Sequence, residues 1–275
     1  MKKEIPILYS TMMAKAKVEK RKTQTRRSSG LDEINTNPDQ WQFVGELVPN
    51  HKQKPQPVFR FMHKESKILV DIQCPYGQPG DLLWGRESVC ESFSGGDYLY
   101  KTNYDDNSHA SELRWKPSIH MPKEAARIWD EVISVKVERV ADISVEDCIA
   151  EGIEYWNIDK DAFEGGELVA DYKNYTWVDD EKHPEYWSPT FANAKYSYRS
   201  LWQLINGKPK AIQQKQNGKL ITTSYIVYPF DAEAGKEFEG LTTWKGKPLT
   251  VVVNPWVWVI ESRQLSVTGK PSYEI

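Results

Sequence analysis

The run Arg21-Lys22-Thr23-Gln24-Thr25-Arg26-Arg27 concentrates four cations and two hydroxyls in seven residues. Guanidinium forks and a lysine ammonium together suit a phosphate, a carboxylate or a polarised carbonyl. A run this polar enters a core only where its charges meet fixed anionic or hydrogen-bonding partners. The simpler alternative is a solvated basic turn, and composition alone does not separate the two.

Glu151 is the second unusual residue, because it is expected in the last turn of a short helix, directly before Gly152. A carboxylate there faces the negative end of the helix dipole, and Asp147 lies one turn earlier on the same face. Both effects are expected to raise the pKa of Glu151. The position is therefore unfavourable unless a cation meets it, with Lys22 or an arginine of the basic run as the candidate. The alternative is a solvent-exposed glutamate.

Lysine, threonine and glutamate together form a chemically coherent set. A desolvated Lys22 amine can act as a general base or stabilise an oxyanion. Thr25 can be the nucleophile or orient a water, and Glu151 can carry the proton to a leaving amine. In an ideal strand Lys22 and Thr25 point to opposite faces, so they converge only if the backbone turns between them.

Short strands with few helices must position these residues. Ser10 is expected to cap a helix from about Thr11 to Lys20, and Ser144 to cap the helix that stops at Gly152. The expected strands are 5–9, 41–47, 58–62, 68–72, 82–84, 98–101, 131–140, 222–228 and 254–261, with an amphipathic helix at 198–205. Residues 154–194 look aperiodic. The pattern predicts an α+β chain built on a small β-barrel that carries insertions.

The bulk properties limit the function classes. A net charge of −3 and a pI near 6.0 exclude a globally basic nucleic-acid coat. Three cysteines form no close pair, which favours a reducing compartment. Met1 is followed by no signal-peptide pattern, and no apolar run approaches the ~18 residues of a membrane helix. We therefore expect a cytoplasmic protein without a membrane partner.

The chain resembles the ASCH domain family, whose fold is a PUA-like β-barrel. The resemblance rests on residues 21–27, Gly80-Asp81-Leu82-Leu83-Trp84, Val137-Glu138-Arg139-Val140 and 143–152. Blocks similar to 74–84, 115–122 and 254–258 recur in this order in the long ASCH proteins of tailed phages and prophages. Stretches 31–57 and 155–195 have no counterpart that we can identify. The family usually has glycine before the Arg-Lys pair, where this chain has Lys20.

The resemblance implies a single ASCH/PUA-like domain over 1–275, with insertions at about 31–72 and 155–248. Small bacterial members hydrolyse N4-acetylcytidine to cytidine and acetate, and their catalytic motif maps onto Lys22, Thr25 and Glu151. The implied function is therefore hydrolysis of an exocyclic amide on a modified pyrimidine nucleoside or base, without a cofactor or metal. A phage origin would place the protein in the host cytoplasm.

Six further residues are candidates for substrate binding: Arg21, Arg26, Arg27, Trp84, Arg86 and Glu87. Trp84 has a core role as its alternative, and the spacing of Cys74, Cys90 and His120 resembles no zinc motif. The rival function is a non-catalytic module that binds a modified base in RNA or DNA, with Arg26 and Arg27 on phosphates. The bulk charge predicts only weak binding to these polymers. A third possibility is an accessory phage protein that binds a host partner through the aromatic insertion 155–202.

Overall fold

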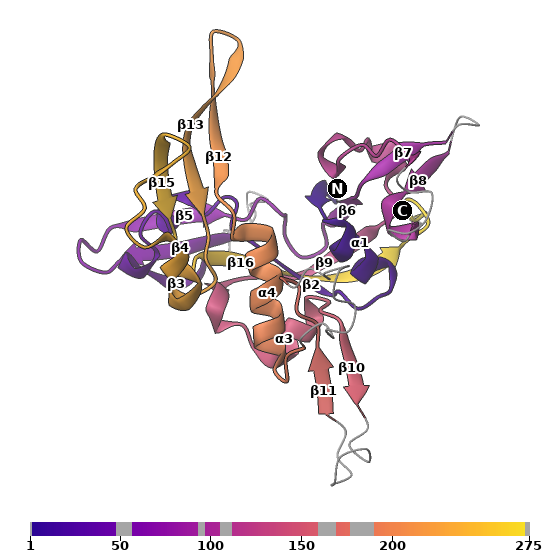
Figure 1. The fold of residues 1–275 in the computed structure, drawn as a ribbon, viewed down its shortest axis with the longest axis horizontal. Helices are drawn as coiled ribbons and strands as arrows, with labels where there is room; N and C mark the ends of the chain where they lie inside the picture. Colours follow the sequence, from indigo (N-terminus) through magenta and orange to yellow (C-terminus); the bar gives the residue numbers. More distant parts are fainter. Residues whose placement is uncertain are drawn as a thin grey trace, which may run out of the picture.

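Two long antiparallel strands, β9 (Trp129–Arg139) and β16 (Trp256–Ser266), form the centre of the molecule (Figure 1). The computed structural model describes residues 2–47, 57–92, 97–104, 112–158, 169–176 and 190–272. The main sheet has the strand order β1-β6-β9-β16-β2. Its other members are β1 (Glu4–Leu8), β6 (Leu82–Arg86) and β2 (Gln24–Arg27).

Among the described residues, the strand pairings leave β1 and β2 at the two edges, so hydrogen bonding does not close this sheet. The edges nevertheless approach each other at one end, because Arg27 of β2 donates a hydrogen bond to the carbonyl oxygen of Leu8 in β1 (2.6 Å). Short helices and mostly antiparallel sheets confirm the predicted α+β class.

The helices are short, and most begin at a recognisable cap. They are α1 (Thr11–Val18), α2 (Asp32–Asn35), α3 (Val145–Ala150), α4 (Ala194–Asn206) and α5 (Ala232–Gly235). The predicted caps of α1 and α3 are confirmed: Ser10 accepts from the Met13 amide, and Ser144 from the Asp147 amide. All of these helices except α4 have eight residues or fewer and carry little stability of their own, so packing must hold them in place.

In the described ranges, four smaller sheets surround the main one. Their strands are β3 (Trp41–Leu47), β4 (Val58–His63), β5 (Leu69–Gln73), β7 (Val89–Glu91), β8 (Tyr98–Tyr100), β10 (Tyr155–Ile158), β11 (Val169–Tyr172), β12 (Lys210–Gln216), β13 (Lys219–Val227), β14 (Thr243–Trp244) and β15 (Lys247–Val251). The β12–β13 hairpin projects far from the body (Figure 1). Its turn is Asn217-Gly218, with both residues at positive φ, as a tight hairpin requires.

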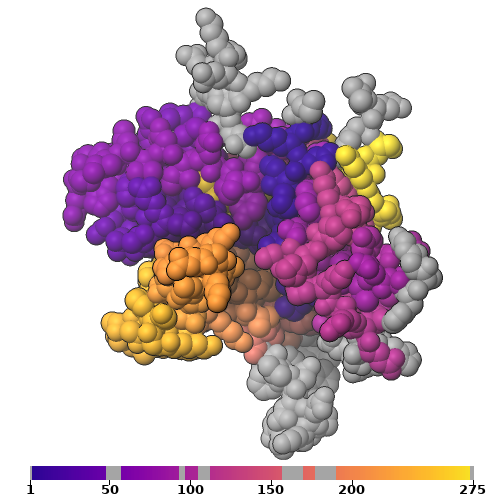
Figure 2. Space-filling view, turned by 90° about the horizontal axis from the view of Figure 1, so that it is seen from above, coloured from indigo at the N-terminus to yellow at the C-terminus, as the bar shows by residue number. Residues whose placement is uncertain are grey.

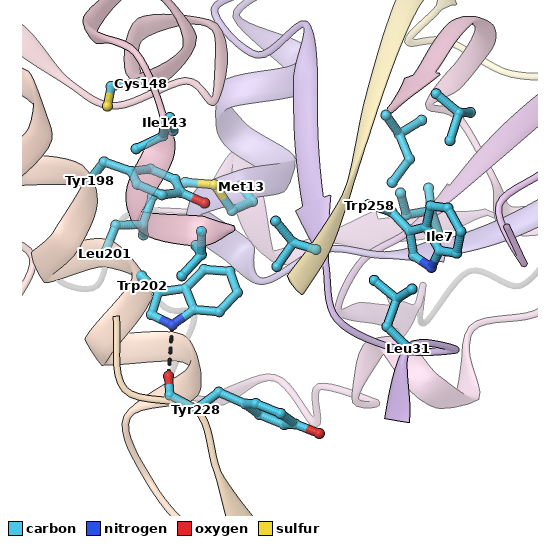
Figure 3. Close-up of a cluster of buried hydrophobic side chains, with 14 of the residues drawn as sticks. Ile7, Met13, Leu31, Ile143, Cys148, Tyr198, Leu201, Trp202, Tyr228 and Trp258 are labelled. Atoms are coloured by element: carbon cyan, nitrogen blue, oxygen red, sulfur yellow. Dashed lines mark hydrogen bonds between the residues drawn. The ribbon is translucent and has the colours of Figure 1, made fainter. Parts of the chain in front are cut away.

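Both predicted insertions pack on the central sheet. Phe59 of β4 meets Trp258 edge-on at 4.9 Å, and Phe61 meets Trp256 at 5.3 Å. From the second insertion, Tyr198, Leu201 and Trp202 of α4 join the same buried cluster (Figure 3). Parts of both insertions, residues 48–56, 159–168 and 177–189, lie outside the described residues.

The expected strands at 41–47, 58–62 and 68–72 are confirmed within one residue, whereas two regions differ from expectation. Residues 154–194, which look aperiodic, contain the β10–β11 hairpin, and the polar stretch 208–248 contains β12, β14 and the start of β15 besides the expected β13. All seven residues of β12 are exposed, so no hydrophobic alternation marks this strand in the sequence. Within the described ranges, no helix has the length and apolarity to cross a membrane.

Candidate active site

The basic run folds against the C-terminal end of α3. Three consecutive carbonyl oxygens there, those of Ala150, Glu151 and Gly152, accept hydrogen bonds in order from Thr23 N (2.8 Å), Lys22 Nζ (2.8 Å) and Arg21 Nη1 (2.5 Å). Cationic donors complement the negative end of a helix and satisfy its free carbonyls. The run therefore caps α3 and fixes Glu151, the C-cap residue, beside Lys22.

Lys22 and Glu151 form a buried ion pair. Lys22 Nζ lies 2.5 Å from Glu151 Oε2, and both residues are 3% exposed. Burial lowers the pKa of Lys22 to about 8, although the charge of Glu151 acts in the opposite direction. At neutral pH a modest change in surroundings is then enough to deprotonate this amine.

The expected rise in the pKa of Glu151 is wrong. Burial alone would raise this pKa, but the charges of Lys22 and Arg26 outweigh burial and lower it. Arg26 Nη1 lies 3.2 Å from Glu151 Oε1, and Arg26 Nη2 lies 2.7 Å from Asp147 Oδ2. Because the guanidinium lies between the two carboxylates, it removes the like-charge repulsion predicted from their spacing.

Arg26 holds the carboxylates of the site in place. Its Nε donates to Glu138 (2.7 Å), so the guanidinium binds three carboxylates, and its side chain is fully buried. The solvated-turn interpretation is thus wrong for Lys22, Thr25 and Arg26, each at most 3% exposed. Four of the five N–H donors of this guanidinium are taken by Glu138, Glu151, Asp147 and Gln24, so Arg26 is held by protein groups rather than presented to a phosphate as expected.

Thr25 lies beside Tyr9, and its hydroxyl forms no hydrogen bond to Lys22. Both hydroxyls are buried, and neither forms a well-shaped hydrogen bond to the described part of the chain. They are nonetheless close enough that the Thr25 hydroxyl acts to lower the pKa of Tyr9, against a larger increase caused by burial. Lys22 precedes β2, which begins at Gln24, and the positive-φ residue of this segment is Lys20, so the chain turns before Lys22 and not between Lys22 and Thr25 as convergence would require.

Lys20 occupies the position at which the sequence departs from the motif that it resembles, where glycine is usual. Its φ of +62° lies in the left-handed region that favours glycine, directly after the last residue of α1 and its C-cap. The departure in sequence therefore keeps the glycine-type backbone, and the turn that brings Lys22 toward Glu151 forms all the same.

The ion pair lines a small recess covered by α4. The walls are Met13, Lys22, Arg26, Arg27, Glu151, Tyr198, Leu201, Trp202, Ile205 and Asn206, and the enclosed volume is about 20 Å³. This space holds about one water molecule. The Trp202 indole is fixed by a hydrogen bond to the Tyr228 carbonyl oxygen (2.8 Å; Figure 3).

A larger cavity of about 320 Å³ adjoins the recess and shares six of its residues: Met13, Arg26, Arg27, Trp202, Ile205 and Asn206. Its other walls are Leu8, Tyr9, Ser10, Ser28, Ser29, Ser118 and Lys210. Sequence reasoning missed the α4 residues and Lys210, because only the amphipathic pattern and the excess of aromatic residues in 155–202 pointed to this segment.

Four of the predicted substrate-binding residues lie elsewhere. Arg21 caps α3, pairs with Glu19 (2.6 Å) and lines a different surface pocket beside Trp156. Trp84 belongs to a second buried cluster with Val89, Met121, Ala125, Ala126 and Trp129, which confirms its core alternative. Of the six candidates, only Arg26 and Arg27 line the recess and the cavity.

Arg86 and Glu87 stabilise this second cluster. The Arg86 guanidinium lies 5.6 Å from the Trp84 ring centroid and donates to the Ile119 carbonyl. Glu87 is fully buried and accepts hydrogen bonds from Arg127 (2.9 Å) and Thr102 (2.8 Å). A buried carboxylate paired in this way is structural, so closeness in sequence to Trp84 gave a misleading signal.

Among the described residues, no group of three or more His, Cys, Asp or Glu side chains converges as a metal site would. No family model, curated protein or solved structure matches this chain. The functional argument therefore depends on the geometry of the recess together with the motif resemblance.

Proposed function

We propose that this chain is an amidohydrolase that cleaves an exocyclic amide on a modified pyrimidine nucleoside or base of the N4-acetylcytidine type. The observation that carries the proposal is the buried Lys22–Glu151 pair, which Arg26 fixes at the bottom of a recess next to a larger cavity. A desolvated lysine next to an ionised carboxylate can move a proton in a water-poor site.

In the proposed reaction, a water in the recess beside Lys22 attacks the acyl carbon; Thr25, which lines neither the recess nor the cavity, can take the role of nucleophile only if substrate binding moves its hydroxyl toward Lys22. Neutral Lys22 accepts the proton of the nucleophile, and Glu151, hydrogen-bonded to Lys22 Nζ, relays it to the exocyclic nitrogen as the carbon–nitrogen bond breaks. With water as the nucleophile, acetate and the free amine form directly; with Thr25 as the nucleophile, an acyl-threonine ester forms as the amine leaves, and a water then cleaves this ester, which releases acetate and restores the threonine hydroxyl. The products are the free amine of cytosine and a carboxylic acid.

Two buried hydroxyls support this arrangement. Thr25 Oγ1 and Tyr9 Oη are each buried without a well-shaped hydrogen bond to described groups, which is costly unless a ligand or solvent satisfies them. Tyr9 also lines the outer cavity. A carbonyl or hydroxyl of the substrate would be a suitable partner for these groups.

The PUA-like barrel is part of the same proposal. Its support is the five-stranded main sheet, whose edge strands β1 and β2 are bridged by Arg27 at one end. In this view the two insertions are additions to an ASCH domain. The sheet positions Thr25 and Arg26, and the second insertion supplies α4 as the cover of the site.

A non-catalytic module that binds a modified base is the second candidate. The small volume of the recess favours it, because about 20 Å³ does not admit an acetyl group without movement of α4 side chains. In that case the Lys22–Glu151 pair would be only a structural link between the basic run and α3.

A panel assay decides between the two candidates. The purified chain is incubated with cytidines that carry acetyl, propionyl or benzoyl groups on N4, and the free acid and cytidine are quantified. Equal amounts of acid and cytidine from at least one substrate support the amidohydrolase. Binding of the same compounds without turnover supports the module.

A further inference from the structure

The outer cavity has an unusual balance of charge. It lies between the N-terminus of α1, the end of β2, the end of α4 and the start of β12, and Ser118 lines it as well. Figure 2 shows a hollow between the orange hairpin and the magenta part of the chain. The polar side chains on its wall include four serines, Asn206, two arginines and Lys210. None of its wall residues is acidic.

Two of its three cations form no direct ion pair in the described part of the chain. Arg27 donates to the carbonyl oxygens of Arg26 (3.1 Å) and Leu8 (2.6 Å), and Lys210 Nζ donates to Asn206 Oδ1 (2.8 Å). Within the described ranges neither forms an ion pair, in contrast with Arg26 and its three carboxylates. Two like charges on one cavity wall repel each other, and an anion between them would remove that cost.

The pKa of Lys210 is consistent with this crowding. Desolvation of the ammonium and the charge of Arg27 both lower it, although much of the Lys210 side chain stays exposed. The N-terminus of α1 adds to the positive potential, because Ser10, its N-cap residue, lies on the cavity wall. Three independent sources of positive potential thus act on one cavity.

We propose that Arg27 and Lys210 form a phosphate subsite at the mouth of the Lys22–Glu151 recess. The substrate is then a nucleotide, with its base toward the recess and its phosphate between the guanidinium and the ammonium. The choice of a cytosine base rests on the proposed function, whereas the phosphate is inferred from the cavity itself. A volume of about 320 Å³ lies at the lower end of the range for ligand pockets, ~300–1,000 Å³.

The phosphate can come from a free nucleotide or from a strand. Residues 208–230, which include the projecting hairpin, contain four lysines and no acidic residue, so they offer further contacts to neighbouring phosphates. The bottom of the cavity is the same in both cases. Affinity for a short strand relative to a mononucleotide distinguishes the two sources.

The test is calorimetric binding of unmodified ligands to the full chain at low salt. Cytidine, cytidine 5′-monophosphate and a short cytosine-containing single strand are compared. Charged hydrogen bonds to the phosphate are expected to give the monophosphate at least about tenfold higher affinity than cytidine. Higher affinity for the strand than for the monophosphate identifies a polymer as the source, and equal affinity identifies the free nucleotide; both support the subsite.

Lys210→Ala is the decisive variant, because Arg27 also bonds two backbone carbonyls and its removal could disturb the fold. The variant is expected to lose the preference for the monophosphate. Lys215→Ala is the matched control, since Lys215 lies on the same exposed strand but not on the cavity wall. Its preference for the monophosphate should be unchanged.

Three results would overturn the subsite. They are equal affinity for cytidine and its monophosphate, no measurable binding of any phosphorylated ligand, and equal losses in the two lysine variants. None of these readouts requires turnover. A chain that prefers the monophosphate but releases no acid would therefore refute the hydrolase and support the subsite. A chain that releases acid but binds cytidine and its monophosphate equally would support the hydrolase and refute the subsite.

Discussion

Lys22 Nζ lies 2.5 Å from Glu151 Oε2 and 2.8 Å from the Glu151 carbonyl oxygen, although 129 residues separate the two along the chain. This double contact joins the basic run to the C-terminus of α3. Lys22 therefore has a structural and a chemical role, because the same ammonium caps the helix and donates a hydrogen bond to the carboxylate that is proposed to transfer the proton. The predictions below separate these roles.

Removal of either partner should destabilise the fold. Glu151→Gln leaves Lys22 and Arg26 buried without this carboxylate and is expected to lower the free energy of unfolding by about 3–5 kcal/mol. In the double variant with Lys22→Met the lone buried ammonium is gone as well. The decrease in the free energy of unfolding of the double variant, measured by urea unfolding, should be smaller than the sum of the decreases in the two single variants by ~1 kcal/mol or more.

The exposed ion pair Arg60–Asp71 is the control for this comparison of single and double variants. Its Nε–Oδ1 distance is 2.7 Å, and its side chains are 33% and 40% exposed. Asp71→Asn should cost less than about 1 kcal/mol. Strict additivity of the Lys22 and Glu151 substitutions would contradict the coupling of this buried pair.

The pH dependence follows from the pKa of Lys22, which lies at about 8 in the folded chain against a usual value of 10.5. Between these values the unfolded chain binds more protons than the folded chain, so the free energy of unfolding should rise with pH from about 8 upward. Glu151 has a lowered pKa; its contribution is present above about 4.5 and is lost as the pH falls.

Activity should follow the neutral form of Lys22. If the amine is the general base, kcat/KM increases with pH and levels off above about 8. A profile that is flat from pH 6.5 to 9 would contradict this role, and a decline through the same range would indicate that protonated Lys22 stabilises an oxyanion instead.

Gly152 is expected to be intolerant of a side chain. Its φ is +86°, and a Cβ there would lie 2.8 Å from Lys22 Cβ and 2.9 Å from Ala16 Cβ. Gly152→Ala should therefore lower the free energy of unfolding by ~2 kcal/mol or more and also reduce turnover, because Lys22 must move.

Gly240→Ala is the matched control, since its φ is +75° and no atom lies within 4 Å of the added carbon. Only the conformational penalty of about 1 kcal/mol remains there. Equal losses for the two glycine variants in chemical unfolding would show that contact with Lys22 is unimportant.

Local rules in the sequence predicted the framework of the site. The caps at Ser10 and Ser144 and the need of Glu151 for a cation follow from hydrogen bonding and charge within a few residues. The role of Arg26 did not, because composition does not reveal whether a guanidinium faces a ligand phosphate or the carboxylates of Glu138 and Asp147. That choice depends on contacts more than 100 residues away.

The cover of the site was beyond sequence reasoning for a similar reason. Tyr198 and Trp202 belong to an amphipathic helix whose apolar face could pack on any part of the core. Trp84 and Glu87 show the opposite error: they lie in or next to a block that resembles a family motif, but the structure places them at a second buried cluster. Periodicity identifies a buried face, but it does not identify the surface against which that face packs.

The most direct test is the rate of acetate release from N4-acetylcytidine by the wild-type chain and by Lys22→Met, with folding of both verified by circular dichroism. The account predicts release by the wild type and a loss of ~10²–10⁴-fold in kcat/KM for Lys22→Met. Lys215→Met, the same substitution on the exposed hairpin, should retain full activity. No release by the folded wild type, or equal rates with and without the Lys22 amine, would contradict it.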